Sequence, residues 1–406
     1  MNCSGNDLEC FLNLSDQPNG NRFITEDEIA DEPSYPLKMD VCKDCWQVQI
    51  DAFPGQEILF DDHPYVSGVN VPVVEHFKAL AASVQQDIGF GKGDIVLDIG
   101  SNDGSLLSAF RALGATTIGV DPGLRVTQLA RENGHLTCRA FWNGDTARSL
   151  RALSVTPKII SATAVFYHVP DLHDFIEGLK VLMADDTVFV VQGVSMLDVI
   201  TKNQFDHFYH EHSCIHSVSA LTRLFGRHGM TVFDAMHHEI HGGSFVAYVA
   251  KDTAGRSVSP RVEAFLERER EGGLENLESY HAFANRVETN VGALRALLSD
   301  LKAQGRSVMG LGAPLKGSTL LNYGKIGPDL ISALTEVNDF KIGRLAPGVH
   351  IPVIDERTLV DEPDYYVVLA WNFLDFFVEK KRDYLESGGK LIVPVPELRV
   401  IGKDDV

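Results

Sequence analysis

The sequence lacks any long apolar run and carries little positive charge. No stretch of its 406 residues approaches the roughly 18 apolar residues that a membrane span needs, and the first ten have neither the basic nor the apolar region of a signal peptide. We therefore expect a cytoplasmic protein with no membrane partner. The net charge of −20 disfavours a nucleic-acid partner, because a phosphate backbone needs a basic face. Anionic small molecules are still allowed where a few basic residues gather.

Cysteine is also sparse, and the six present do not suggest a disulfide framework. Cys42 and Cys45 form a Cys-Lys-Asp-Cys knuckle, a spacing that can hold zinc from one side. A second pair would complete a tetrahedron, but the upstream candidates, Cys3 and Cys10, are separated by six residues instead of two. We expect a structural zinc held by Cys3, Cys42 and Cys45, with Cys10 as the candidate fourth ligand. A knuckle without metal and a redox pair are the alternatives.

What the sequence does contain is a well-marked strand, glycine turn and helix. Residues 95–99 are β-formers, residues 106–113 have the apolar spacing of an amphipathic helix, and Gly-Ser-Asn-Asp-Gly lies between them. A second apolar run, residues 117–120, ends on Asp121. This order predicts two parallel strands that present the turn and the acidic side chain at one edge of an open sheet.

An edge of this kind can bind a nucleoside. Glycines let the backbone approach the ligand, and a carboxylate on the next strand accepts both ribose hydroxyls. The turn departs from GxGxxG, which favours S-adenosylmethionine over a dinucleotide, because S-adenosylmethionine has no pyrophosphate to place at a helix N-terminus. We expect cofactor contacts from Gly100, Asn102, Gly104 and Asp121. The alternative is a turn that only packs strand on helix.

Beyond Asp121, helical and extended segments alternate, which predicts a parallel sheet in an α/β protein. The strand 158–162 leads to His168, which is expected at the sheet edge where ligands bind, or as an ordinary surface histidine. The richest stretch follows at residues 205–217, FDHFYHEHSCIHS. Its HEH order lacks the HExxH spacing of zinc proteases, so proton transfer is favoured over metal binding or polar packing.

The C-terminal third begins with long helical patterns over residues 261–304 and then repeats the strand, glycine turn and helix in SVMGLGAPLKGSTLLNY, residues 307–323. GLGAPLKG on its own is a weak signal. Lys316 suits a phosphate contact, and a purely structural turn is the equal alternative. The HGGS turn upstream makes His241 a candidate substrate contact.

Taken together, these segments resemble the three-domain C-methyltransferases that act on nucleotide-linked deoxysugars. The resemblance covers nearly the whole chain and includes VCKDC, DIGSNDG with Asp121-Pro122, HVPDLHDF, NQFDHFYHEH, HGGS, GLGAPLKGSTLLNY, KIGR with PGVHIP, and AWNF. It implies a zinc-knuckle domain over residues 1–62, a class I methyltransferase (Rossmann-like) domain over residues 63–258, and a helical linker with a second α/β domain over residues 259–406.

The resemblance also implies roles for single residues. His212 matches the histidine that removes a proton, with Tyr209, Glu211 and His168 beside it. Thr163 joins the expected cofactor contacts. The expected substrate contacts are Tyr65, His210, His241, Lys316 and Asn322.

The sequence departs from the family pattern at several positions. The first cysteine of the N-terminal pair is absent, and other residues are usual where His63, Thr163, Gln192, Ile215 and Val246 stand. We expect several of these positions to face cofactor or substrate. The reaction class is therefore expected to be kept, while the substrate differs from the usual keto-deoxysugar.

The chemistry expected is methylation, in natural-product sugar biosynthesis, of the carbon next to a ketone. That carbon must lose a proton to become nucleophilic, so the site needs a base and a donor for the enolate oxygen. The rival hypotheses are a diverged member that methylates another small molecule, a scaffold that binds S-adenosylmethionine without transfer, and an NAD-dependent enzyme that uses GLGAPLKG. The sequence leaves the oligomeric state open.

Overall fold

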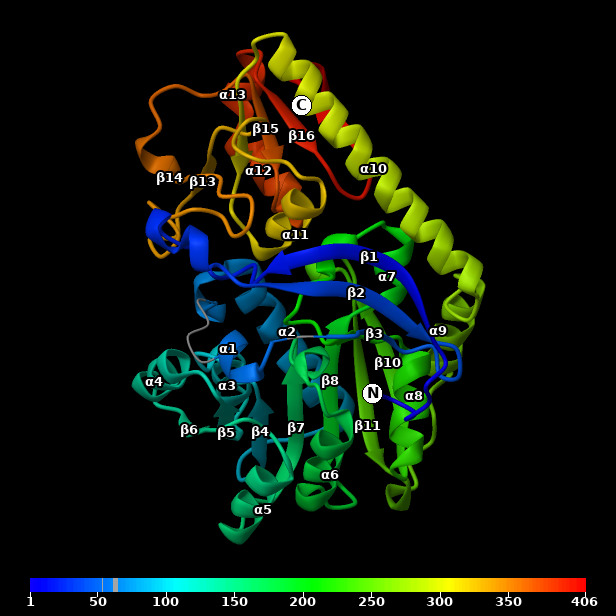
Figure 1. Ribbon diagram of the computed structural model, residues 1–406. Helices are drawn as coiled ribbons and strands as arrows, with labels where there is room; N and C mark the ends of the chain where they lie inside the picture. Colours follow the sequence, from blue (N-terminus) through cyan, green and yellow to red (C-terminus); the bar gives the residue numbers. More distant parts are fainter. Residues whose placement is uncertain (53, 61–64) are drawn as a thin grey trace.

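The computed structural model describes residues 1–52, 54–60 and 65–406, which form three β-sheets with helices around them (Figure 1). The middle sheet lies in the lower half of that view, the C-terminal sheet lies above it, and the first hairpin crosses between the two. Within these described ranges, no helix is long and apolar enough to cross a membrane.

The middle sheet has seven strands in the order β10-β11-β8-β7-β4-β5-β6, with β4 to β8 parallel and β11 antiparallel to both of its neighbours, β8 and β10. Its central strands are apolar on both faces because helices cover both sides; all seven residues of β8 are buried. The strands are β4 (Ile95–Ile99), β5 (Thr116–Asp121), β6 (Leu136–Arg139), β7 (Pro157–Thr163), β8 (Val188–Val194), β10 (Met230–His238) and β11 (Ser244–Lys251).

The helices of this part confirm the alternation predicted from the sequence. They are α1 (Gln56–Phe60), α2 (Val71–Ile88), α3 (Ser105–Ala112), α4 (Leu124–Glu132), α5 (Gly144–Ala152), α6 (Leu172–Leu182), α7 (Met196–Thr201) and α8 (Val218–Arg227). The chain runs from β4 through β5 to β6 on one side and then returns to place β7 on the other side of β4. The crevice between β4 and β7 is therefore a topological switch point, where open α/β sheets bind ligands.

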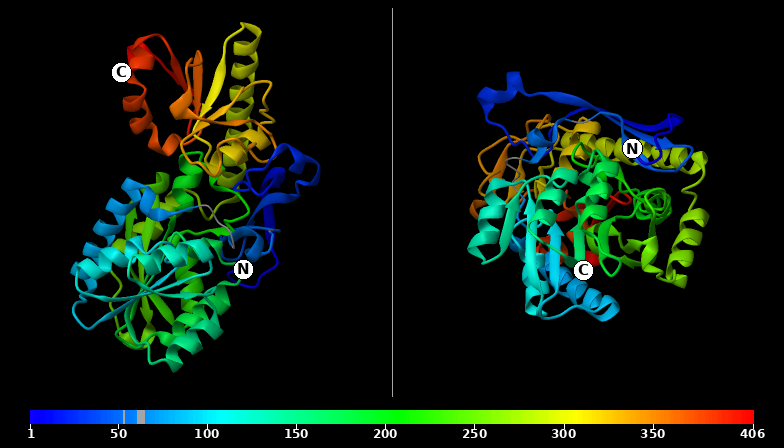
Figure 2. Two further views of the ribbon diagram at one scale, coloured as in Figure 1. Left: turned by 90° about the vertical axis from the view of Figure 1, so that its left-hand side faces the viewer. Right: turned by 90° about the horizontal axis from the view of Figure 1, so that it is seen from below.

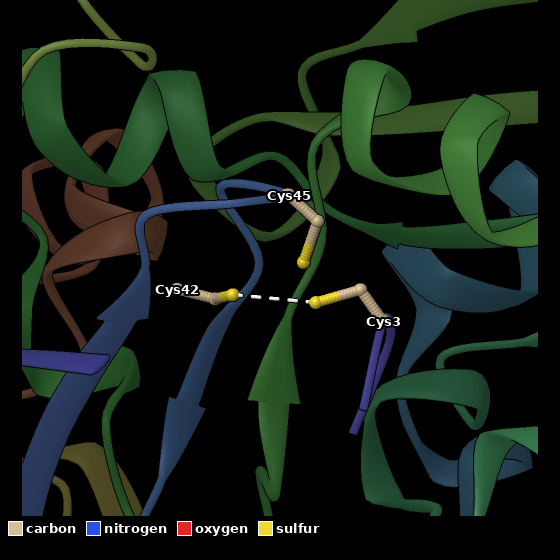
Figure 3. Close-up of side chains that lie close together, drawn as sticks. All are labelled: Cys3, Cys42 and Cys45. Carbon is tan, nitrogen blue, oxygen red and sulfur yellow. Dashed lines mark hydrogen bonds between the residues drawn. The ribbon is translucent and has the colours of Figure 1, made fainter. Parts of the chain in front are cut away.

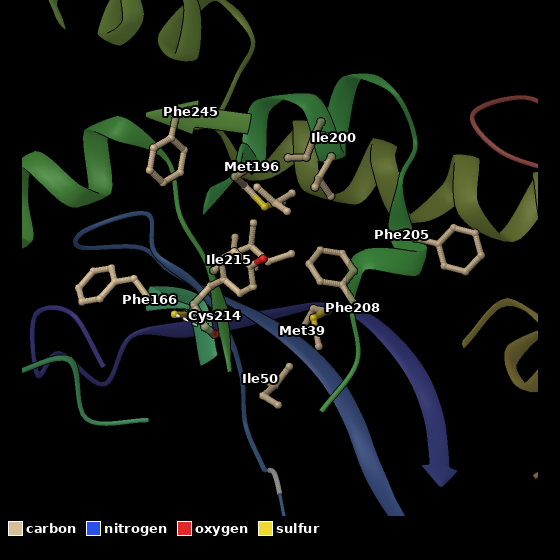
Figure 4. Close-up of a cluster of buried hydrophobic side chains, with 14 of the residues drawn as sticks. Met39, Ile50, Phe166, Met196, Ile200, Phe205, Phe208, Cys214, Ile215 and Phe245 are labelled. Carbon is tan, nitrogen blue, oxygen red and sulfur yellow. Dashed lines mark hydrogen bonds between the residues drawn. The ribbon is translucent and has the colours of Figure 1, made fainter. Parts of the chain in front are cut away.

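The N-terminal sheet is antiparallel and takes its last strand from the middle of the chain. Its order is β1-β2-β3-β9, built from β1 (Leu8–Pro18), β2 (Ser34–Cys42), β3 (Val48–Ile50) and β9 (Cys214–Ile215). The hydrophobic core continues across this joint: Met39 and Ile50 of the hairpin strands face Phe208 and Ile215 of the middle segment (Figure 4). Folding the first sheet therefore fixes the segment that leads into β9.

The C-terminal sheet has the order β14-β13-β12-β15-β16-β17, parallel except for the last strand. Its strands are β12 (Val308–Leu311), β13 (Leu334–Glu336), β14 (Val353–Asp355), β15 (Tyr365–Val368), β16 (Lys390–Val393) and β17 (Arg399–Ile401), and its helices are α11 (Leu315–Tyr323), α12 (Leu374–Lys380) and α13 (Arg382–Glu386). The connection consists of α9 (Pro260–Glu271) and α10 (Leu277–Ala303). The long α10 buries one stripe and runs along the outside of the molecule.

The first hairpin also contacts the C-terminal part. Ile24, between β1 and β2, exchanges backbone hydrogen bonds with Leu345, and the Arg344 guanidinium donates to the carbonyl oxygen of Phe23. The views from the side and from below show the hairpin lying against both larger parts (Figure 2). The first hairpin thus contacts both the middle part and the C-terminal part of the chain.

Candidate active site

A cavity of about 320 Å³ lies at the carboxyl ends of β4, β5 and β7, at the switch point of the middle sheet. Its wall includes most of the residues that the sequence singles out for ligand contact: Tyr65, Gly100, Asn102, Asp121, Thr163, His168, Glu211 and His241. The structure thus brings the predicted cofactor turn and part of the predicted catalytic cluster to one cavity.

The glycine turn and Asp121 form a fixed cradle. Gly100 has φ 71° and Asn102 has φ 48°, a left-handed bend that brings the backbone to the cavity. The Asp121 carboxylate accepts the N–H of Asn102 at 2.9 Å and that of Gly123 at 2.8 Å. The Asn102 side chain in turn accepts the N–H of Ser67 at 2.9 Å, which ties the segment before α2 to the turn. The carboxylate is therefore oriented before any ligand arrives.

The cradle fits a nucleoside-containing cofactor by a second observation. The hydroxyl oxygen of Thr163, at the end of β7, is buried and has no hydrogen-bond partner within the described chain, although Thr163 is on the cavity wall. A buried polar atom of this kind needs a partner. Phe141, Trp142 and Arg125 also line the cavity and were not predicted. Their places in the sequence could have indicated them. Phe141 and Trp142 come just after β6, and Arg125 comes four residues after Asp121, so all three lie at the same carboxyl edge of the sheet.

The other end of the cavity is polar and involves the first hairpin. The Nδ1–H of His168 donates to the backbone oxygen of Glu211 at 2.7 Å, and the Glu211 carboxylate accepts from the amide of Asn21 at 2.7 Å. Asn21 lies in the loop between β1 and β2, so the N-terminal sheet helps to position this wall. No local sequence pattern predicts such a contact between residues 190 positions apart.

His212 lies directly behind this wall. Its ring centroid is 3.9 Å from that of Tyr209 and 5.1 Å from that of His168, and its side chain is buried. The Nδ1–H donates to the backbone oxygen of His207 at 2.7 Å, which leaves the lone pair on Nε2. Burial, together with the neighbouring His168, holds the pKa of His212 well below its usual range, and burial raises the pKa of Tyr209 well above its own. The imidazole of His212 is thus neutral at neutral pH.

Four predicted ligand contacts are placed elsewhere. Gly104 begins α3 with φ 82°, and a side chain there would meet the ring of His135. His210 donates to the backbone oxygen of Pro36, and Asn322 donates to those of Ser318 and Pro347. Lys316 is partly buried beside His207. Within the described residues none of the four is on the cavity wall. The structure gives Gly104 a turn position and the other three side chains contacts between segments.

The departures from the family pattern mostly avoid the cavity as well. Ile215 and Val246 are buried in the hydrophobic core, and Gln192 is buried with its amide oxygen 2.8 Å from the ring of His76. His63 lies outside the described residues. Of the remaining departures, Thr163 is the one on the cavity wall, which corrects the expectation that several of them face a ligand.

The knuckle brings three of the four expected cysteines together. The ligand atoms of Cys3, Cys42 and Cys45 lie within 4.8 Å of one another (Figure 3). A tetrahedral zinc with Zn–S bonds of about 2.3 Å holds its sulfurs about 3.8 Å apart, so the three thiols fit three of its corners. Cys10 is exposed, and its sulfur lies 3.9 Å from the backbone oxygen of Leu12, which removes it from the group.

Domain families and relatives agree with this architecture. Residues 74–235 match the model "Methyltransferase domain", residues 239–396 match "C-methyltransferase C-terminal domain", and residues 2–60 match a domain model named for zinc binding. The C-methyltransferase NovU of Streptomyces niveus is 33% identical over 386 residues, which is 95% of this chain and 92% of that protein.

Solved structures give weaker likenesses. The magnesium protoporphyrin IX methyltransferase of Synechocystis PCC 6803 is 15% identical with a TM-score of 0.35, over 45% of this chain and 81% of that one. A methyltransferase of Anabaena variabilis is 12% identical with a TM-score of 0.36, over 46% of this chain and 88% of that one. The family assignment rests on the domain models and on the relative. The chain belongs to the S-adenosylmethionine-dependent C-methyltransferases, with a central methyltransferase domain, the C-terminal domain of that family and an N-terminal domain that matches the model named for zinc binding.

Proposed function

We propose that this enzyme methylates the carbon next to the ketone of a nucleotide-linked sugar, through an enolate. One observation carries the proposal: a single cavity joins the cofactor cradle to a wall of His168, Glu211 and His241, with His212 directly behind it. Carbon methylation needs this combination, because a C–H next to a carbonyl is not nucleophilic until a base removes its proton. The resemblance to nucleotide-sugar enzymes supports the substrate class.

The cofactor end has a positioning role. When bound, S-adenosylmethionine supplies an electrophilic methyl group on a sulfonium. The Asp121 carboxylate would accept its ribose hydroxyls, and the backbone at Gly100 would lie against it, with Thr163 as a further polar contact. Holding the acceptor carbon in line with the methyl group accounts for much of the acceleration that such an enzyme provides.

The substrate end carries the proton transfer. His212 is proposed as the base, since its Nδ1–H is fixed on a carbonyl and its Nε2 is left to accept a proton. Tyr209 and His168 adjoin it and are proposed to donate to the enolate oxygen. Because His168 is on the cavity wall and His212 is one layer behind, His168 is the alternative base.

The scaffold hypothesis loses much of its motivation. That hypothesis depends on residues that differ from the family pattern at positions expected to touch ligands. Three of these residues, Ile215, Val246 and Gln192, are instead buried inside the protein. Their substitution adjusts packing and leaves the polar wall in place.

Deuterium exchange tests the base directly. With S-adenosylhomocysteine in place of the methyl donor, an enzyme that forms the enolate should wash solvent deuterium into the carbon next to the ketone of a nucleotide keto-sugar. His212→Asn should lower this exchange by roughly 10²-fold or more with cofactor affinity nearly intact, and His168→Asn should lower it less. His281→Asn, on an exposed side chain, is the matched control. Equal exchange by His212→Asn and wild type would remove His212 as the base.

A structural zinc in the knuckle is proposed as well. Elemental analysis of protein purified without added metal should give one zinc per chain, and Cys42→Ser should lose it. Cys10→Ser should keep the metal, because that thiol is outside the group. A metal content near zero in the wild type would refute the zinc site.

A further inference from the structure

The loop that carries His212 is held from the C-terminal sheet by one face of α11. The ring of Tyr323 contacts that of Phe205 at a centroid distance of 6.1 Å, and the hydroxyl of Thr319 donates to the backbone oxygen of Phe208 at 3.2 Å. The third contact comes from Lys316, whose Nζ lies 2.8 Å from Nε2 of His207. The first two are ordinary docking contacts between a helix and a loop.

Lys316 is partly buried, and its amino group lies against the buried ring of His207. Besides His207, its surroundings are the indole of Trp371, with Nζ 5.1 Å from the ring centroid, and the nearby carboxylate of Asp206. Burial lowers the pKa of Lys316 to about 8, and Asp206 opposes that shift. Burying an amine costs stability, and replacing a buried charged group by an apolar one is often neutral or favourable. Docking of α11 alone therefore does not explain this lysine.

Asp206 belongs to the same buried group. Its carboxylate accepts the indole N–H of Trp371 at 2.5 Å, and its other oxygen has no partner within the described chain. Trp371 follows β15 and Lys316 begins α11, so both come from the switch point of the C-terminal sheet, between β12 and β15. At this switch point, where open α/β sheets bind ligands, Lys316 and Trp371 thus contact the loop that carries His212, and a cavity of about 440 Å³ lies beside Trp371.

His207 links this group to the base. Lys316 holds its imidazole, and its backbone oxygen accepts the Nδ1–H of His212 at 2.7 Å. The rings of His207 and His212 are nearly parallel, at 18°, with centroids 6.2 Å apart. The same Nε2 also lies 3.1 Å from the backbone oxygen of His241, while Nδ1 is buried without a partner in the described chain. Because one ring nitrogen cannot both accept from Lys316 and donate to a carbonyl, the ammonium of Lys316 selects the tautomer with its lone pair on Nε2. Without Lys316 the ring would keep one polar contact.

We propose that Lys316 is a positioning residue for the base: by holding the ring of His207, it keeps the His207 carbonyl where it fixes His212 with the proton on Nδ1 and the lone pair on Nε2. The proposal rests on the proposed role of His212. It replaces the sequence-based expectation that Lys316 binds a phosphate, because Lys316 is not on the wall of the cavity. It also gives the C-terminal domain a part in catalysis that does not require contact with substrate.

The test compares three substitutions on α11 in the full-length enzyme. Lys316→Met keeps the length without a donor, Lys316→Gln keeps a neutral donor, and Thr319→Val removes a docking contact of the same helix. Lys316→Met should lower deuterium exchange about tenfold to a hundredfold, the cost of a misplaced catalytic group, with KM and cofactor affinity nearly unchanged. Lys316→Gln should recover part of the loss. Thr319→Val should lower the melting temperature while exchange stays close to wild type.

Nitrogen NMR of the imidazoles makes the inference independent of the rate measurements. His212 should be a single Nδ1–H tautomer in wild type and Thr319→Val, and a mixture in Lys316→Met. An unchanged tautomer together with wild-type exchange would overturn the proposal, as would a raised KM with unchanged kcat, which would make Lys316 a substrate contact. If neither wild type nor His212→Asn exchanges, the proposed function fails, and if His212→Asn exchanges normally, only the assignment of His212 as the base fails. In both cases the tautomer shift still decides whether Lys316 orients the His212 imidazole.

Discussion

The middle and C-terminal sheets contain the same local unit and use it differently. Each has a strand, a glycine with positive φ (71° at Gly100, 80° at Gly312), a helix, and a second strand that ends on an acidic residue, Asp121 or Glu336. In the middle sheet the acidic residue borders a cavity of about 320 Å³. In the C-terminal sheet the Glu336 carboxylate accepts the backbone N–H groups of Ala313, Val337 and Asn338.

The comparison shows that the strand, glycine turn, helix and second strand predict the local backbone geometry but do not predict whether a ligand binds there. After Gly100 the chain continues with small polar residues and leaves space, whereas after Gly312 it leads into Lys316, whose amino group contacts His207 in the loop that carries His212.

The largest contrast should come from adding one methyl group to each turn. Both glycines have positive φ, so alanine should cost about 1–2 kcal/mol of unfolding free energy at either position. At Gly100 the new Cβ would also collide with Cγ2 of Val165, and overpacking typically adds about 1–3 kcal/mol. At Gly312 the nearest atoms are 3.7 Å away. Urea denaturation should therefore find Gly100→Ala clearly less stable than Gly312→Ala, and equal losses would contradict the close approach.

An intermediate effect is expected from the two acidic residues. Asp121→Ala should weaken S-adenosylmethionine binding by roughly 1–3 kcal/mol, or about 5- to 150-fold, because a ribose would lose its partner. Glu336→Gln should leave that affinity unchanged and lower stability, because one amide cannot accept from three N–H groups as the carboxylate does. Titration calorimetry measures the first effect and thermal unfolding the second. Weaker cofactor binding by Glu336→Gln would erase the distinction between the two edges.

The smallest effect concerns pH. The contacts that cover the loop of residues 205–217 also exclude water from it. Burial lowers the pKa of His212 well below 6.5 and the pKa of His241 to about 4. A base with a lowered pKa stays neutral as the pH falls through 6.5 and loses its lone pair only at lower pH. Deuterium exchange should therefore change little between pH 7.5 and 6, whereas an unshifted histidine would lose about three quarters of its activity at pH 6. A midpoint near 6.5 would indicate a solvated base.

Much of the middle sheet could be predicted from the sequence. The strand at 95–99, the helix after the turn and Asp121 at the end of the next strand are encoded by local periodicity, and the structure confirms them. The position of His168 just after the end of β7 also predicts its place at the carboxyl edge of the sheet, where it lines the cavity. The same reasoning missed Phe141 and Trp142, although they directly follow β6 at the same edge.

The rest could not be predicted, because it depends on contacts between distant segments. The strands β1 and β2 are interrupted by register shifts and give no clean alternation. The two-residue β9 is a strand because β3 lies beside it. Lys316 after a glycine turn is indistinguishable in sequence from a phosphate-binding lysine, and Cys10 from a zinc ligand, until the fold shows what lies next to them.

The origin of β9 has a consequence for synthesis on the ribosome. The side chain of Gln47 donates to the backbone oxygen of Ile215, which is 168 positions later. At a translation rate of about 5–20 residues per second, β9 is synthesised roughly 8 to 34 seconds after β3, and the outer edge of β3 is unpaired during that time. An open strand edge can pair with neighbouring chains. Conditions that slow elongation between β3 and β9 should therefore lower the soluble yield of this protein more than slowing near its C-terminus.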